Sequence, residues 1–247
     1  MSVNGAITTL PLLYLPADEP PPPKEILTAV QAVVMTGGQT GRPLSDLPRQ
    51  DAGCLLLARI GTSGDPGEDE LAALIGNGFD GIVLSGCRGP ADIQRLDVLL
   101  RVAEAAAGKA EGRTVILAEY ATAPESVLSP HSLAGASPRL SALIFDASAL
   151  AEACGCRRVT ETGDVPAVVR AGRAAAVLRG HEARIAAYDM LPVDADDEAA
   201  VRRLWKSSVE NGFSSVAIRS PQQIDLLAAA GVAPQAQTGL IDDDGLR

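Results

Sequence analysis

Aromatic side chains are scarce in this sequence of 247 residues, which has one Trp, three Tyr and three Phe. Apolar residues nevertheless make up 47% of the chain, enough for a large core. That core is therefore expected to consist of Ala, Val, Leu and Ile. No apolar run approaches the ~20 residues that cross a bilayer, and the first residues lack the pattern of a secretory signal. We expect a cytoplasmic protein that does not associate with a membrane.

An excess of positive charge is also missing. The chain has 21 Lys and Arg against 31 Asp and Glu, for a formal net charge of −10. A nucleic-acid surface needs Lys and Arg to neutralise phosphates, so the balance argues against a nucleic-acid partner. Small anionic ligands are not excluded, because a few arginines can make a site locally positive.

The four cysteines do not form a disulfide or metal framework. Cys154 and Cys156 are separated by one residue, which is too close for the usual metal or redox spacing. Cys54 opens an apolar run and is expected to be a small buried residue, and Cys87 lies just beyond another run. A reducing compartment suits all four. The two histidines do not combine with Ser and Asp at a spacing typical of a catalytic triad.

Short apolar runs of about five or six residues recur along the chain and alternate with helical patterns. This alternation is typical of a (β/α)₈ barrel, and the length of the chain matches one such domain. We predict a single TIM-barrel domain over residues 1–247, with loose tails at 1–9 and 233–247. The predicted strands are 10–16, 32–35, 54–60, 81–85, 113–120, 142–146, 185–189 and 215–220.

Two of the predicted helices have clear signals. The segment 196–212 begins with acidic residues, and its helical spacing places an apolar stripe against the barrel. That stripe contains Val201, Leu204, Trp205 and Val209. Ser220 is expected to cap the last helix, with Pro221 in its first position.

Two isolated charges lie near the C-terminal ends of predicted strands. Arg59 is close to the end of 54–60, and Glu119 is close to the end of 113–120. Active sites of (β/α)₈ barrels are built from these strand ends, so we predict both residues to be catalytic. The alternative is that Glu119 is a buried carboxylate that pairs with Arg59 as internal scaffolding.

Four segments of the chain resemble one family, in order and over nearly the whole length. LLYLPAD is similar to the family's LLFVPGD opening, and GFDGIVLSGCRGPADIQRLDVLL is similar to GxDGIVLPKVESAEDVxxLDxLL. LAEYATAPESVLSPHSLAGASPRLSALIFDASALA resembles LIETAxGVxxxxEIAxASPRVxALxFGxxDLA, and GFSSVAIRSPQQID resembles GFxGKxAIHPxQxE. The sequence is thereby identified as a divergent member of the citrate lyase beta-subunit-like family, also called HpcH/HpaI aldolases.

The resemblance implies an activity and a site. Members of this kind cleave or form a carbon–carbon bond beside an acyl-CoA thioester or a 2-keto acid. A strand-five Glu and a strand-six Asp hold Mg²⁺, which stabilises the enolate, and a strand-three Arg holds the anionic group. Carried over, Glu119 falls on the metal-binding Glu and Arg59 on the substrate Arg.

Several positions depart from the family pattern. The second metal ligand falls on Ala149, whereas Asp146 lies three residues earlier at the strand end. Asp146 would then either replace the missing metal ligand beside Glu119 or cap the short helix that follows. The acidic strand-two motif is replaced by VMTGGQT, and the strand-four Pro-Lys is replaced by Ser-Gly. The strand-eight His is Arg219, which adds a fixed positive charge.

These departures suggest an anion site that depends less on a metal. Arg59, Arg88, Asp189 and Arg219 are predicted to bind the substrate. The alternative for Arg88 and Arg219 is that both are solvated residues on the rim of the barrel.

The first hypothesis is a Mg²⁺-dependent carbon–carbon lyase or aldolase-like protein that acts on an acyl-CoA thioester or a small 2-keto acid. The second is a catalytically degenerate member that binds a CoA-like or carboxylate ligand, or a partner subunit. A third is an acyl-CoA thioesterase. The family also implies a homo-oligomer. The sequence leaves open the substrate and whether catalysis survives the missing carboxylates.

Overall fold

The structure is a computed structural model that describes residues 10–37, 53–61 and 67–230. Eight parallel strands pair in sequence order, and β1 also pairs with β8, so the sheet closes into a barrel. The strands are β1 Leu12–Pro16, β2 Ala32–Thr36, β3 Leu55–Gly61, β4 Gly81–Cys87, β5 Val115–Tyr120, β6 Leu140–Phe145, β7 Ala186–Met190 and β8 Ser215–Ile218. The predicted (β/α)₈ barrel is confirmed.

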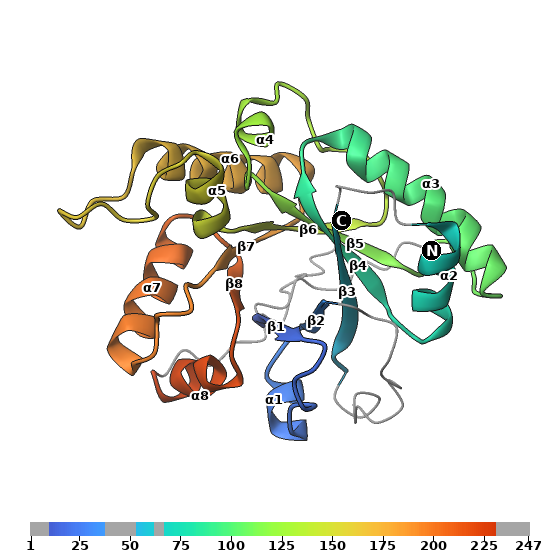
Figure 1. The fold of residues 1–247 in the computed structure, drawn as a ribbon, viewed down its shortest axis with the longest axis horizontal. Helices are drawn as coiled ribbons and strands as arrows, with labels where there is room; N and C mark the ends of the chain where they lie inside the picture. The colour runs from blue at the N-terminus through green and yellow to red at the C-terminus, as the bar shows by residue number, and fades with distance from the viewer. Residues whose placement is uncertain (1–9, 38–52, 62–66, 231–247) are drawn as a thin grey trace, which may run out of the picture.

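Eight helices lie outside the strands within the described residues (Figure 1). They are α1 Lys24–Thr28, α2 Glu68–Gly76, α3 Pro90–Ala106, α4 Pro124–Leu128, α5 Ala147–Ala153, α6 Ala167–Ala183, α7 Glu198–Glu210 and α8 Pro221–Ala229. Each predicted strand overlaps an observed one, with ends that differ by a few residues. The segments 1–9 and 233–247, predicted to be loose tails, lie outside the described residues.

Side chains along each strand alternate between the barrel interior and the helix layer, as strand geometry requires. The interior cluster contains Leu12, Tyr14, Ala32, Val34, Leu57, Val83, Leu117, Ala142, Ile144, Ala186, Tyr188, Met190 and Ala217. A larger cluster fills the space between strands and helices. The expected aliphatic core is present, although Tyr120 and Phe145 are among the largest fully buried side chains.

The ends of the helices follow local sequence signals. The Ser220 hydroxyl accepts a hydrogen bond from the Gln222 amide at 3.2 Å, and Pro221 opens α8, so the predicted cap is confirmed. In α7 the prediction for Val209 was wrong, because its side chain is exposed. Ser208 takes the buried position instead, and its hydroxyl donates to Asp189 Oδ2 at 2.6 Å. The hydrogen bond from Ser208 to the buried carboxylate of Asp189 thus orients the last turn of α7, with Ser208 inward and Val209 outward.

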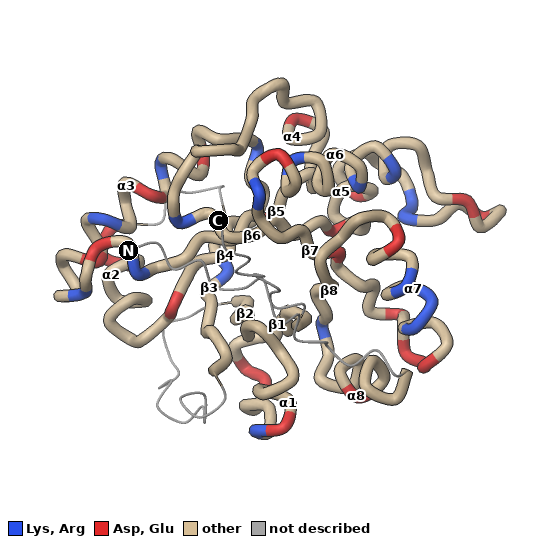
Figure 2. Tube along the Cα trace, turned by 180° about the vertical axis from the view of Figure 1, so that it is seen from behind, with Lys and Arg blue, Asp and Glu red and all other residues tan. Residues whose placement is uncertain are grey.

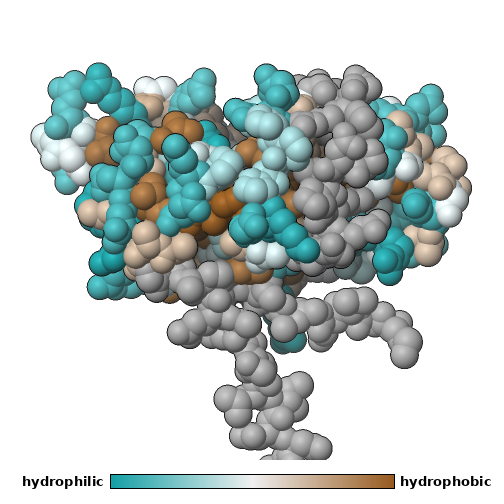
Figure 3. All heavy atoms as spheres, turned by 90° about the horizontal axis from the view of Figure 1, so that it is seen from below, coloured by the Kyte–Doolittle hydropathy of each residue, from teal (hydrophilic) through white to brown (hydrophobic). Residues whose placement is uncertain are grey.

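The outer surface is mixed in charge and polarity. Basic and acidic residues both occur along α3 and α7 (Figure 2). On the face seen in Figure 3, hydrophobic residues lie among hydrophilic ones. Within the described ranges, no helix combines the length and the apolar character that crossing a bilayer requires.

Candidate active site

Charged and hydroxyl side chains meet at the C-terminal ends of the strands. Arg59 and Glu119 are two residues beyond the interior residues Leu57 and Leu117, so strand alternation turns them into the mouth of the barrel. The residues that contact one another there are Tyr14, Arg59, Ser85, Glu119, Asp146 and Arg219. We refer to these six residues as the mouth cluster.

Arg59 and Glu119 form a two-pronged ion pair. Nε of Arg59 lies 2.6 Å from Oε1 of Glu119, and Nη2 lies 2.8 Å from Oε2. The same Nη2 donates to the Ser85 hydroxyl at 2.6 Å. Glu119 is buried, whereas the side chain of Arg59 is 38% exposed. The guanidinium therefore has one side on the carboxylate and one side open to a ligand. Paired guanidinium and carboxylate groups of this geometry form strong, directional contacts.

Tyr14 is a member of the cluster that sequence reasoning missed. Its hydroxyl donates to Oε1 of Glu119 at 3.1 Å. Burial, followed by the charge of Glu119 and the hydrogen bond to it, raises the pKa of Tyr14 well above its ordinary value. The hydroxyl therefore stays protonated and acts as a donor. The available signal was a hydroxyl at an interior-facing position near the end of an otherwise apolar strand.

Asp146 and Arg219 form a second ion pair at the mouth. Oδ2 of Asp146 accepts a hydrogen bond from Nη2 of Arg219. Oδ1 of Asp146 accepts from the amides of Ser148 and Ala149, at 2.9 and 3.3 Å, and caps α5. The capping role is thus observed. The same carboxylate also pairs with Arg219, and metal binding by Asp146 stays a prediction.

The two ion pairs have related architectures. Arg59 extends from β3 past β4 to Glu119 on β5, and Arg219 extends from the end of β8 past β7 to Asp146 after β6. The two carboxylates therefore lie at the ends of the neighbouring strands β5 and β6. Arg59 approaches from the β3 side of the barrel, and Arg219 approaches from the β8 side. The charge of Asp146 has a small effect on the pKa values of Tyr14 and Arg59, to which burial and Glu119 contribute more.

The structure does not bring Asp189 or Arg88 to this cluster. Asp189 lies on the outer side of β7, where it accepts from Ser208 and pairs with Arg173 of α6 at 2.7 Å. Burial raises the pKa of Asp189, and Arg173 and Ser208 act to lower it. Arg88 is exposed and binds Asp92 at 2.9 Å, which matches the alternative of a solvated rim residue.

Cys87 does not present a reactive thiol. Its side chain is buried, and Sγ donates to the Gly89 carbonyl at 3.6 Å. Burial raises the pKa of the thiol to about 12, so the nucleophilic thiolate is absent at neutral pH.

The donors in the mouth cluster have the chemistry that Mg²⁺ requires. This ion is commonly held by one or two carboxylates, with water or substrate oxygens completing its shell. Glu119 and Asp146 supply two carboxylates from adjacent strands. In the part of the chain that the structure describes, no group of three or more His, Cys, Asp or Glu side chains is arranged to hold a metal. The protein would thus contribute two ligands, both now paired with arginines.

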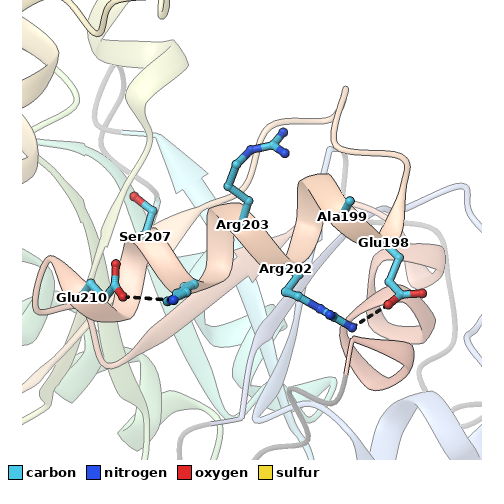
Figure 4. A pocket seen from close by; sticks show the side chains of 7 residues that line it. Glu198, Ala199, Arg202, Arg203, Ser207 and Glu210 are labelled. Carbon is cyan, nitrogen blue, oxygen red and sulfur yellow. Dashed lines mark hydrogen bonds and ion pairs between the residues drawn. The ribbon is translucent and has the colours of Figure 1, made fainter.

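A surface hollow of about 630 Å³ lies elsewhere, along the outer side of α7 (Figure 4). Its described lining is Glu198, Ala199, Arg202, Arg203, Lys206, Ser207 and Glu210. Arg202 pairs with Glu198 and Lys206 with Glu210, which is ordinary for an exposed helix face. None of these residues belongs to the mouth cluster, and the converging charges place the candidate site at the mouth.

Solved structures with the same fold cover most of the chain. RipC from Yersinia pestis has 22% identity and a TM-score of 0.65, over 90% of this chain and 94% of that one. The citrate lyase beta subunit complexed with oxaloacetate and magnesium from M. tuberculosis has 18% identity and a TM-score of 0.65, over 91% and 97%. The Haloferax volcanii malate synthase pyruvate/acetyl-CoA ternary complex has 15% identity and a TM-score of 0.68, over 98% and 74%.

No curated protein matches the sequence. The family model for HpcH/HpaI aldolase/citrate lyase matches residues 44–221, which is more than half of the chain. The matched segment runs from before Arg59 to beyond Arg219 and therefore includes most of the mouth cluster. The chain belongs to the HpcH/HpaI aldolase/citrate lyase family.

Proposed function

We propose that this protein is a carbon–carbon lyase or aldolase-type enzyme whose active site is the mouth cluster. The observation that carries the proposal is the Arg59–Glu119 pair, which joins a half-open guanidinium to a buried carboxylate at the C-terminal end of the barrel. Family membership and the position of the pair support the same reaction class.

The residues of the cluster divide the work by their chemistry. Arg59 holds a carboxylate of the substrate through its planar fork, and Ser85 orients that fork. Glu119 and Asp146 would hold Mg²⁺. When bound, the ion would supply the electron sink for the enolate that forms as the carbon–carbon bond breaks. The Tyr14 hydroxyl donates a hydrogen bond to Glu119 and so orients its carboxylate.

We propose an acyl-CoA thioester or a small 2-keto acid as the substrate. The structures of similar fold point in this direction, because one contains oxaloacetate and magnesium and another contains pyruvate and acetyl-CoA. A partly exposed arginine at the mouth suits the carboxylate that such substrates carry.

A second function is binding of a carboxylate or CoA-like ligand without lyase chemistry. The observation in its favour is that both candidate metal carboxylates are paired with arginines, Glu119 with Arg59 and Asp146 with Arg219. Two carboxylates and two guanidiniums sum to zero charge. In this function an anion would compete with Glu119 and Asp146 for the two arginines, and no metal would take part.

Calorimetric titration with Mg²⁺ separates the two functions. Binding that is lost in Glu119→Gln and weakened in Asp146→Asn is expected for the lyase. Asp92→Asn is the matched control, because it removes a carboxylate near the same end of the barrel that pairs with the exposed Arg88. No heat in the wild-type protein at millimolar metal, either alone or with saturating succinate, would favour the ligand-binding function.

Product analysis then identifies the reaction. Acyl-CoA thioesters of hydroxy acids should yield a shorter thioester together with a carbonyl product. Release of free CoA without a carbonyl product would contradict the lyase and select the thioesterase. The absence of any product, with retained anion binding, would again select the ligand-binding function.

We further propose a homo-oligomer, as the family resemblance implies. Several large apolar side chains are exposed on outer helices, including Val98 on α3 and Leu178 on α6. Exposed apolar side chains mark an interface where they form a contiguous patch. Light scattering after size-exclusion chromatography measures the state directly, and a monomer at all concentrations would contradict the proposal.

A further inference from the structure

The two guanidiniums of the mouth cluster occupy the same carboxylates that would hold a metal. Arg59 covers both oxygens of Glu119, and Arg219 covers one oxygen of Asp146. The other oxygen of Asp146 is already used by the cap of α5. A cation at either carboxylate therefore competes with the guanidinium that now pairs with it.

Releasing one member of such a pair leaves its partner uncompensated. Glu119 is buried and Asp146 is nearly so, with its side chain 13% exposed, so an unpaired charge is poorly solvated at this depth. A cation bound alone would leave two arginines without counter-charge. An anion bound alone would leave two carboxylates unpaired at the ends of the neighbouring strands β5 and β6. Binding of either ligand alone is therefore opposed, because it leaves charged side chains without their counter-charges.

We propose that the mouth cluster exchanges both ion pairs together, so that Mg²⁺ and a small dicarboxylate bind cooperatively and Arg219 forms the second anion subsite. The two carboxylates of the ligand take Arg59 and Arg219, and Glu119 and Asp146 are released to the cation. The inference rests on the proposed function, because it uses the same metal carboxylates.

Two features favour a ligand with two anionic groups. The side chains of Arg59 and Arg219 are similarly exposed, at 38% and 35%, so both are open to solvent on one side. They come from β3 and β8, which are separated by β1 and β2, and they converge on adjacent carboxylates. A ligand with a single carboxylate would displace one arginine from its ion pair and leave the other ion pair in place.

Calorimetry with matched probes tests the inference. The Mg²⁺ affinity of the wild-type protein is measured alone, with saturating succinate and with saturating butyrate, which has the same four carbons and one carboxylate. We expect succinate to raise the Mg²⁺ affinity about tenfold or more, within the usual range of coupling between sites, and butyrate to raise it less. Coupling is reciprocal, so Mg²⁺ must raise the succinate affinity by the same factor.

Two variants test whether Arg219 is responsible for the coupling. In Arg219→Met, Asp146 is free from the start, so Mg²⁺ should bind more tightly without any anion, and the succinate effect should fall to that of butyrate. Arg219→Gln serves as a second variant if the first does not fold. Arg88→Met is the control, because it removes an exposed guanidinium near the same end of the barrel and should retain the full effect.

The outcomes separate this inference from the proposed function. Mg²⁺ binding that succinate does not change, or coupling that persists unaltered in Arg219→Met and Arg219→Gln, would overturn the inference and leave the metal site intact. No Mg²⁺ binding under any condition, in the wild-type protein or the variants, would overturn both.

Discussion

The hydroxyl of Tyr14 lies 3.1 Å from Oε1 of Glu119, although the two residues are 105 positions apart in the sequence. Tyr14 is on β1 and Glu119 on β5, so the contact crosses the mouth of the barrel. Arg59 donates to the same oxygen at 2.6 Å. Two donors from different strands thus fix the orientation of the carboxylate on which the candidate site is centred.

Replacing Tyr14 with Phe should loosen that carboxylate while preserving the barrel. The loss of one buried hydrogen bond is expected to lower the free energy of unfolding by about 1 kcal/mol and to reduce turnover about tenfold or more. Urea unfolding and steady-state kinetics measure the two effects. Tyr188→Phe is the control, since Tyr188 also faces the interior but is not among the described donors to Glu119. Equal turnover in both variants would exclude Tyr14 as a positioning residue.

Replacing Arg59 with Lys should weaken binding of carboxylate ligands although the charge is kept. An ammonium group cannot reproduce the planar fork that engages both oxygens of a carboxylate. We expect the dissociation constant for a dicarboxylate to rise about tenfold or more, equivalent to about 1.4 kcal/mol. Calorimetry with succinate measures it. An unchanged constant would show that the anion is held elsewhere.

Replacing Asp189 with Ala should affect stability and leave ligand binding unchanged. The Ser208 hydroxyl and Arg173 would lose their acceptor between β7 and the outer helices. The free energy of unfolding is expected to fall by about 1–3 kcal/mol. Anion affinity by calorimetry should match that of the wild-type protein. A large loss of affinity in a folded variant would restore the sequence-based role of Asp189 in substrate binding.

A buried ion network between α3 and the start of β6 should determine how the free energy of unfolding changes with pH in acid. Arg139 donates to both oxygens of Glu104 at 2.7 Å and to Asp97 at 2.7 Å. Burial acts to raise the pKa of Glu104, but the hydrogen bonds from Arg139 and the amides of Thr114 and Gly112 lower it to about 2.

Because the folded-state pKa of Glu104 lies below the ordinary value of 4.5, the ionised group stabilises the fold above that value. The contribution, on the order of 3 kcal/mol, is lost as the pH falls from about 4.5 toward 2. Urea unfolding at several pH values measures the slope. Glu104→Gln should be less stable at pH 7 and should show a shallower loss in acid. Parallel curves for the two proteins would contradict the assignment.

A methyl group at Gly81 should destabilise the floor of the barrel. A Cβ there would lie 2.4 Å from Val115 Cγ2 and 2.6 Å from the Val115 carbonyl oxygen. Because a backbone atom cannot move aside, Gly81→Ala is expected to lower the free energy of unfolding by about 1–3 kcal/mol. Gly76→Ala is the control, since no atom lies within 4 Å of its added Cβ in the described structure. Equal melting temperatures would contradict the packing argument.

The sequence by itself determined the barrel and predicted four of the six residues of the mouth cluster. Short apolar runs, separated by amphipathic helices, have few other ways to bury their surfaces, so all eight strands were found. Arg59 and Glu119 were found because a lone charge near the end of a buried strand has to face either the mouth or the helices. The family resemblance added a direction for the chemistry.

Tertiary structure decided how the charges are partnered. Tyr14 and Arg219 reach their carboxylates from strands that are not neighbours, and no local pattern encodes contacts between residues 105 and 73 positions apart. The side of the barrel that Asp189 faces depended on the exact register of β7, because a shift of one residue turns a strand side chain to the opposite face. Pairing of each carboxylate with an arginine is likewise a property of the closed barrel. Only closure brings the ends of β3 and β8 within reach of β5 and β6.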